Sequence, residues 1–394
     1  MAYSSNIHTE KSGSRIIVAD CLRGFAVCGI IMIHFLEHLN FWDFSQVTIT
    51  PFDQGLFDTV FFLGSNKMYA IFALLFGFSC YVQHHNQEIK GRDFRGRFVW
   101  RMILLFLWGM VDLLFYNGDI LCTYAVLGIL LVPLVKAPDK VLYVVAAVFF
   151  LQPVELAYSV AGLADPTLSP LNLGSDAAWP MILPECASGS ILDVAVVGHR
   201  YGLPVNFTWA IENGRLTQTY LLFVVGLIIG RKQLLLDGAG NLAFWKKVCI
   251  GSIIAFVPFQ LLVSFVPGQI ANTTVSSSLM IMFKAWRNFS MTAFYVSGII
   301  LLFYCTKWKN ALMHFSYFGK MSLSCYLIQS IAGGFLFYNW GLGMFRYSPH
   351  STSLLLSIFF LVILYVFCRF WITRHRRGPL EEVWNRATWI GGRK

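Results

Sequence analysis

Charged side chains are scarce in this chain of 394 residues. Asp, Glu, Lys and Arg together make up 13% of it, against about 25% in an ordinary soluble protein. Hydrophobic residues reach 57% and aromatic residues 16%. This balance leaves too little charge to cover a water-soluble globule, and it excludes disordered and collagen-like chains. The sequence therefore predicts an integral membrane protein whose length allows about ten helical spans.

Motifs of the common soluble enzymes and of ATP-driven pumps are also missing. The chain has no Walker loop, no G-x-G-x-x-G, no G-x-S-x-G and no H-E-x-x-H. It has nine cysteines, but only Cys186 lies in a long polar stretch, so neither a disulfide framework nor zinc spacing is present and no metal is predicted. No small-residue cleavage site follows the first apolar segment, which predicts a retained span rather than a signal peptide.

Long apolar segments are abundant instead. Ten of them have spanning length: 17–36, 57–82, 98–116, 119–136, 140–162, 216–236, 246–266, 284–305, 315–338 and 352–372. Each is predicted to be a helix, because lipid offers backbone groups no hydrogen-bond partner and these runs are far too long for barrel strands. The predicted fold class is all-α, a polytopic membrane protein with about ten transmembrane helices around a central polar cavity.

Basic residues alternate along the chain in a way that predicts its orientation. They gather in every second connection and in the C-terminal tail, so the positive-inside rule places both termini in the cytoplasm. The net charge of +10 follows from this bias, and no nucleic-acid partner is predicted. A segment at 163–215, rich in Pro, Gly, Asp and Asn, becomes an extracytoplasmic loop between the five-span halves 1–162 and 216–394. It is either a lid over a central cavity or a passive connector.

The first apolar segment carries ionisable residues, which are costly inside a membrane and therefore informative. Arg23 and His34 are 11 residues apart, which places them within about 20° of one helix face and about 16 Å apart along the axis. Asp20 lies one turn before Arg23, and Glu37 lies one turn after His34. A buried imidazole beside a carboxylate suits general-base catalysis, and a guanidinium at the cytoplasmic mouth suits a phosphate group. The alternative is that Arg23 pairs with Asp20 and His34 only packs.

Other polar groups interrupt the later segments. Lys67 lies in the second one, Asp119 and Tyr124 at the start of the fourth, and Gln329 in the ninth. Lys67 is a site residue or an interfacial one, Asp119 a site residue or a helix N-cap, and Gln329 a site residue or a bond between helices. We predict substrate- or cofactor-binding roles for all four.

Several stretches resemble the YeiB-like family of bacterial membrane proteins. They are Asp20-Cys-Leu-Arg-Gly, Leu74-Leu-Phe-Gly-Phe78, Gly118-Asp-Ile-Leu121 and, in the C-terminal half, Gly319-Lys-Met-Ser-Leu-Ser-Cys-Tyr326. The resemblance covers about residues 15–390 and implies a multi-pass protein of the bacterial plasma membrane. That family is placed in a wider transmembrane acyltransferase group with acyltransferase-3 and heparan-alpha-glucosaminide N-acetyltransferase, which modify extracytoplasmic sugars using cytoplasmic acyl-CoA.

The resemblance also implies roles for individual residues. The acyltransferase-3 pattern has an Arg, ten residues and then a His on the first helix, as Arg23 and His34 do here. Arg23, with Arg97 and Arg101 at the basic cytoplasmic rim, would bind the acyl-CoA donor. His34, with Glu37 and Asp20 as further catalytic candidates, would transfer the acyl group to a small-molecule, lipid-linked or other extracytoplasmic acceptor.

Two other functions are compatible with the same residues. The buried charges suit a transporter or channel, where they line a permeation route or a proton relay. They also suit a non-catalytic membrane protein in which they only lock helices together. The sequence favours the acyltransferase, because the offset between Arg23 and His34 has both a geometric and a chemical reason. It leaves open the acyl group, the acceptor and the oligomeric state.

Overall fold

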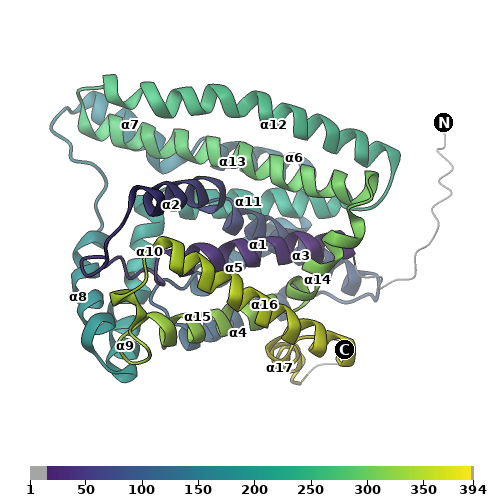
Figure 1. Cartoon of the computed structure of the whole chain (residues 1–394). Helices are drawn as coiled ribbons and strands as arrows, with labels where there is room; N and C mark the ends of the chain where they lie inside the picture. The colour runs from purple at the N-terminus through teal and green to yellow at the C-terminus, as the bar shows by residue number, and fades with distance from the viewer. Residues whose placement is uncertain (1–15, 392–394) are drawn as a thin grey trace.

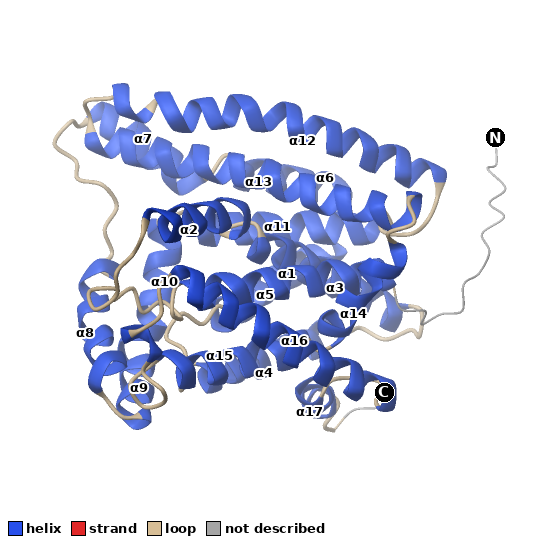
Figure 2. Ribbon diagram, in the orientation of Figure 1, coloured by secondary structure: helices blue, strands red, loops and turns tan. Residues whose placement is uncertain are grey.

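The computed structural model describes residues 16–391, and these form helices and connections without a strand. Residues 1–15 and 392–394, which include the basic residues Arg393 and Lys394, lie outside the described residues. Most of the long helices run roughly parallel to one another (Figures 1 and 2). The order is α1 Ile17–Leu36, α2 Pro51–Gly64, α3 Met68–Glu88, α4 Arg95–Asp112, α5 Leu121–Leu131, α6 Asp139–Phe150, α7 Pro153–Ala164, α8 Ser175–Ser188, α9 Ile191–Val197, α10 Leu203–Glu212, α11 Arg215–Arg231, α12 Ala239–Phe265, α13 Thr273–Cys305, α14 Lys309–Lys320, α15 Ser322–Phe337, α16 His350–Arg374 and α17 Pro379–Thr388.

The predicted apolar segments all become helices, but three of them are broken. The second is α2 and α3 with a break at 65–67, the fifth is α6 and α7 bent by 48°, and the ninth is α14 and α15. Five helices of the described chain are long and apolar enough to cross a membrane, or six if the bent pair counts as one span. The all-helical membrane class is confirmed, whereas the number ten and the sidedness stay predictions.

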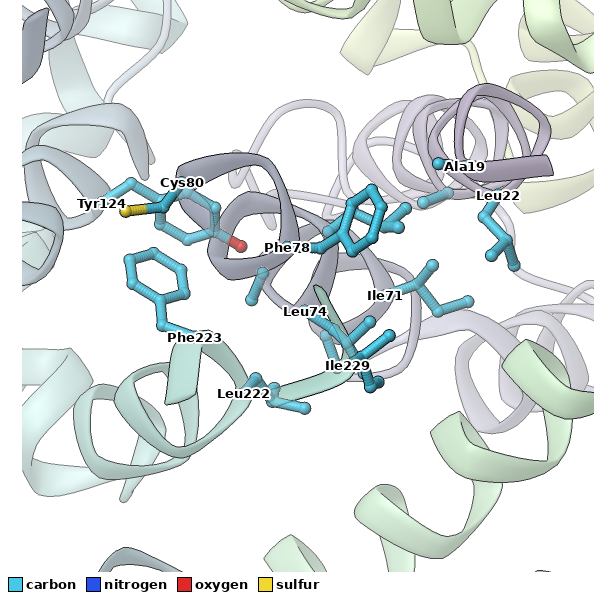
Figure 3. Packing of buried hydrophobic residues seen from close by; sticks show 14 of the residues in the cluster. Ala19, Leu22, Ile71, Leu74, Phe78, Cys80, Tyr124, Leu222, Phe223 and Ile229 are labelled. Atoms are coloured by element: carbon cyan, nitrogen blue, oxygen red, sulfur yellow. The ribbon is translucent and has the colours of Figure 1, made fainter. Parts of the chain in front are cut away.

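The helix α1 lies at the centre of the bundle and packs against α3, α14, α15 and α16. The apolar core beside it comes from α1, α3, α5 and α11, and Figure 3 shows this packing around Leu22, Ile71, Leu74, Tyr124 and Phe223. The helices α12 and α13 pack mainly on one another along one side of the molecule (Figure 1). Because α1 is enclosed, its polar side chains face protein rather than lipid.

The basic clusters that were expected in the cytoplasm meet at one end of the bundle. Lys136 contacts the carboxylate of Asp93 at 3.4 Å, and Arg231 contacts that of Asp139 at 2.8 Å. The helix α17 lies at the same end (Figure 1) and binds the first turns of α4 and α15. The start of α1 is there too, since Gly319 at the end of α14 packs against the backbone of Asp20.

The segment 163–215 is largely helical rather than an open loop. It contains α8, α9, a π-helical turn η2 Gly198–Gly202, and α10, which gather at the end of the bundle away from α17 (Figure 1). The turn η2 packs on the connection after α4, where the backbone of Leu113 and the side chain of Asn117 leave no room for a side chain at Gly198. Asn206 donates a hydrogen bond to the carbonyl of Asn117 at 3.0 Å. This segment therefore covers the connection that carries Tyr116.

Candidate functional site

The imidazole of His34 lies among three polar side chains at the far end of α1. Its Nε2 is 3.3 Å from the hydroxyl of Tyr116, and its Nδ1 is 3.1 Å from the amide nitrogen of Gln329. The rings of Tyr116 and Tyr326 lie with their centroids 5.0 Å and 6.5 Å from that of His34. We call this group of four side chains the His34 site.

The amide of Gln329 can bond to either tautomer of His34. With the amide nitrogen facing Nδ1, Nδ1 accepts a hydrogen bond and the proton of the ring lies on Nε2. The oxygen Oε1 of Gln329 is buried without a hydrogen-bond partner. Rotating the amide by half a turn would let that oxygen accept from Nδ1–H, which frees Nε2 to accept a proton. The site therefore contains the orienting partner that a histidine base requires.

A narrow cavity lies beside α1 between Arg23 and His34. It is lined by Val27 and Ile30, which are four and seven residues after Arg23 on the same helix face. The remaining lining residues come from α3, the start of α5 and α15: Tyr69, Phe72, Ile120, Leu121, Tyr124, Tyr326 and Gln329. About 20 Å³ is open to the centre of a water molecule, which is room for roughly one water. We call this cavity the inner passage.

The other end of this helix face carries Arg23. Its guanidinium donates to the carboxylate of Asp20 at 2.8 Å and to the hydroxyl of Ser79 at 2.7 Å. The predicted pair of Arg23 and Asp20 is therefore formed, and it lies at the end of the bundle that also holds α17. Asp20 is about 21 Å along the helix axis from His34, so the structure places it with Arg23 and not in the His34 site.

Arg215 is a basic residue of the site to which the sequence assigned no role. Its guanidinium stacks on the ring of Tyr69 at 3.8 Å and donates to the side-chain oxygen of Asn66 at 3.1 Å. Its charge acts on both His34 and Glu37. No hydrogen bond in the described chain joins Glu37 to His34, so Glu37 is not the partner that orients the imidazole in this structure. The only sequence signal for Arg215 was its position outside the cytoplasmic basic clusters.

Three other predicted site residues have clear structural partners. The ammonium of Lys67 donates to the carbonyl of Phe62 at 2.6 Å and is buried. The carboxylate of Asp119 accepts from the backbone N–H groups of Leu121 and Cys122, both at 2.9 Å, and so caps the start of α5. Tyr124 lines the inner passage and donates its hydroxyl proton to the carbonyl of Tyr69.

Asp112 is a buried acid near the His34 site that was not predicted. It is fully buried, and neither of its carboxylate oxygens has a hydrogen-bond partner of ordinary geometry. Its charge acts on Tyr116 and Tyr326. The sequence signal was its position as an acid within an apolar segment, which is costly without a use.

Arg97 and Arg101 hold the C-terminal helix α17 in this structure. Arg97 donates to the carbonyls of Thr388 and Ile390, both at 3.0 Å, at the end of α17, where cations are favoured. Arg101 stacks on the ring of Trp384 at 3.6 Å and donates to the hydroxyl of Thr388. Both guanidinium groups therefore contact α17 in this structure.

The first turn of α17 is anchored by Glu381. Its carboxylate accepts from the backbone N–H groups of Leu323 and Ser324 at 2.7 and 3.0 Å and from the Ser324 hydroxyl at 2.5 Å, at the start of α15. Burial raises the pKa of Glu381 above its ordinary value, and these hydrogen bonds only partly oppose the shift. The docked state of α17 therefore binds a proton at Glu381 more tightly than the released state does.

Docking of α17 should consequently weaken as the pH rises. Below the ordinary pKa of glutamate both states are protonated. As the pH rises through that value only the released state ionises, and docking is lost up to the raised pKa of the docked state. Hydrogen exchange of the α17 amides, corrected for its intrinsic pH dependence, should show more opening at pH 8 than at pH 5. Glu381→Gln should abolish this trend, whereas Glu382→Gln on the exposed side of α17 should keep it. Equal trends in the wild type and in Glu381→Gln would contradict the prediction.

Comparison with known families follows the two halves of the chain. Residues 15–178, which carry Arg23, His34 and Tyr116, match the family described as heparan-alpha-glucosaminide N-acetyltransferase, catalytic. Residues 229–391, which carry Gln329 and Glu381, match the family described as protein of unknown function (DUF418), which is YeiB-like. This match agrees with the resemblance to the YeiB-like family that the sequence indicated. The site therefore joins residues of both halves, because His34 bonds to Gln329.

Two similar proteins come from Bacillus species. The chain is 26% identical to the uncharacterized protein YxaH of Bacillus subtilis, over 98% of the chain and 97% of that protein. It is 24% identical to an uncharacterized 39.9 kDa protein encoded in an amylase 3' region of Bacillus acidopullulyticus, over 95% and 94% of the two chains. No solved structure matches the chain.

Proposed function

We propose that this protein is a membrane acyltransferase of the bacterial plasma membrane, which moves an acyl group from cytoplasmic acyl-CoA to an extracytoplasmic acceptor. The observation that carries the proposal is the inner passage, which lies along one helix face between a guanidinium and an imidazole. The match of residues 15–178 to an acetyltransferase catalytic domain supports the same reaction class.

Each end of this face of α1 suits one half of the reaction. Arg23 lies at the end of the bundle with α17 and the basic clusters, where a phosphorylated donor would approach. The walls of the cavity between them are mainly apolar and aromatic, and this cavity of about one water would have to widen to admit the uncharged arm that links the phosphates of acyl-CoA to its thioester. His34 lies at the opposite end, under the cover of segment 163–215.

The chemistry assigned to His34 is general-base catalysis. Its Nε2 takes the proton of the acceptor hydroxyl or amine as that group attacks the thioester carbonyl. The carbon–sulfur bond breaks, and the thiolate leaves and is protonated to free CoA. Gln329 holds the ring through Nδ1, while Tyr116 occupies the position next to Nε2 that the acceptor would take.

Blocking the inner passage tests the proposal directly. Val27→Trp places a large ring in a space of about 20 Å³, so we expect the rate of acyl transfer to fall by roughly 10²-fold or more. Val126→Trp on the exposed face of α5 adds the same side chain outside the passage and should leave the rate unchanged. The assay uses purified protein in vesicles, with labelled acyl-CoA on one side and membrane-derived acceptor lipid and sugar on the other.

The blocking experiment also separates acyl transfer from transport. Uptake of a small solute into the vesicles without acyl-CoA, abolished by Val27→Trp, would favour a transporter and contradict the proposal. Full transfer activity in Val27→Trp would show that the acyl group takes another route. Circular dichroism and gel filtration establish that both tryptophan variants are folded, since overpacking alone costs about 1–3 kcal/mol.

A further inference from the structure

A second cavity lies at the break between α6 and α7, away from the His34 site. The chain bends by 48° there, and Gln152 has a left-handed backbone with φ 52° before α7 begins. Unwound backbone inside a membrane is tolerated where it lines a cavity, and broken helices are where transport proteins build ion sites. The cavity has about 60 Å³ open to water centres, which is room for an ion and a few waters.

Glu155 is a buried acid that lines this cavity. Its side chain lies in the first turn of α7, lines the cavity and is only 3% exposed. The position in the first turn of α7 accounts for a carboxylate there, because a negative charge is favoured at a helix N-terminus. The oxygen Oε2 of Glu155 is buried without a hydrogen-bond partner. At Gly214 a Cβ atom would lie 2.9 Å from Oε1, so a glycine at that position leaves room for the carboxylate.

The remaining polar groups that line the cavity also offer oxygen. They are the carboxylate of Glu212, at the end of α10, and the hydroxyls of Tyr158, Ser277 and Ser278. Glu212 is held in place by the backbone N–H of Leu173 and by the N–H and hydroxyl of Ser175. The donor set therefore contains two carboxylates and three hydroxyls, and no nitrogen or sulfur side chain.

Neither of these two carboxylates is paired with a cation of the described chain. None of the ion pairs formed within residues 16–391 includes Glu155 or Glu212. An ionised carboxylate that is buried without a partner costs several kcal/mol. A bound cation would remove this cost and would satisfy Oε2 of Glu155.

We propose that the cavity at the α6–α7 break binds a divalent hard cation, for which Ca²⁺ is the best match. Calcium takes six to eight oxygen ligands, and two carboxylates would neutralise its charge. The described residues contain no group of three or more His, Cys, Asp or Glu side chains that could hold a metal, so hydroxyls and waters complete the coordination. Such a site is expected to bind weakly, in the range of about 0.1–1 mM found in extracellular modules. The ion would join α7, α10 and α13 at the covered end of the bundle.

Thermal unfolding of the full chain in detergent tests this site. We expect the Tm of the wild type to rise saturably with CaCl₂, with a midpoint of roughly 0.1–1 mM, and not with NaCl at the same ionic strength. Glu155→Gln keeps the shape of the side chain and should lose this response. Asp165→Asn removes one charge from the same end of the molecule but lies outside the cavity, so it should keep the response.

Binding of radioactive calcium measured by equilibrium dialysis gives a second readout. Ser278→Ala should weaken calcium binding. This variant replaces Glu155→Gln in the test if Glu155→Gln does not fold. An unchanged Tm of the wild type in CaCl₂, or equal responses of the wild type and Glu155→Gln, would overturn the proposal. A Glu155→Gln variant that is more stable than a salt-insensitive wild type would show that Glu155 is a protonated acid. A response to NaCl alone would overturn the divalent assignment.

Discussion

Replacing His34 with alanine should abolish acyl transfer while the protein still folds and inserts. Removal of a general base typically lowers the rate by about 10²–10⁴-fold, and the loss here should reach that range because both ring nitrogens of His34 are bonded in place. His34→Gln keeps most of the volume and should be equally inactive. The measurement is the transfer of labelled acyl groups from acyl-CoA by purified protein in vesicles.

The matched control for these variants is a histidine elsewhere in the chain. His314 bonds to the hydroxyl of Tyr365 at an exposed position, and His314→Gln should leave the rate unchanged. Tyr116→Phe removes the hydroxyl beside Nε2 but keeps the ring, so its effect should be much smaller than that of His34→Ala. Full activity of folded His34→Ala would remove the proposed mechanism, whereas inactivity of His314→Gln as well would indicate a general loss of structure.

Adding a single methyl group where α1 crosses α14 should destabilise the protein strongly. A Cβ atom at Gly24 would lie 1.8 Å from the carbonyl oxygen of Phe315, and one at Gly319 would lie 1.9 Å from that of Asp20. The neighbouring atoms are backbone and cannot rotate away, so the two helices must separate. We expect Gly24→Ala to cost about 3 kcal/mol, at the upper end of the range for overpacking, as measured by thermal or denaturant unfolding in detergent.

The chain offers a control for this prediction on a lipid-facing helix. A Cβ atom at Gly251 in α12 would meet nothing within 4 Å. Gly251→Ala should therefore be neutral or stabilising by roughly 0.5–1 kcal/mol, because glycine is the poorer helix former. Equal effects of Gly24→Ala and Gly251→Ala would show that helix propensity, and not the close contact between α1 and α14, decides the outcome.

Neighbouring residues of one motif have different structural roles in this chain. The Leu22-Arg23-Gly24 stretch supported a resemblance to acyltransferases, but the structure gives its arginine and its glycine different tasks. Arg23 bonds to Ser79 on α3, whereas Gly24 allows α14 to approach. The sequence alone could not distinguish the roles of Arg23 and Gly24, because their partners Ser79 and Phe315 lie 56 and 291 positions away.

Helix positions could be predicted because hydrophobic length is local. The predicted segment 17–36 coincides with α1. The bounds of the other predicted segments agree with the observed helices to within several residues, except where a helix extends beyond its apolar stretch. A short helix before Lys67 was one of two alternatives that the sequence left open, and α2 matches it. The break at 151–152 and the helices within 163–215 were not predicted, since they depend on the packing of their neighbours rather than on composition. The helix α17 was seen only as a basic tail, because its role depends on docking against Arg97 and Arg101.

The sequence by itself determined that the chain is an all-helical membrane protein with Arg23 and His34 on one face of its first helix, because apolar length and the 3.6-residue period are written along the chain. Only the tertiary structure decided that this face borders the inner passage, that Gln329 orients His34, and that Arg215 rather than Arg97 or Arg101 lies near it. Those contacts join residues that are far apart in sequence. They arise from how α1, α3, α5, α11 and α15 pack, and no local pattern records that packing.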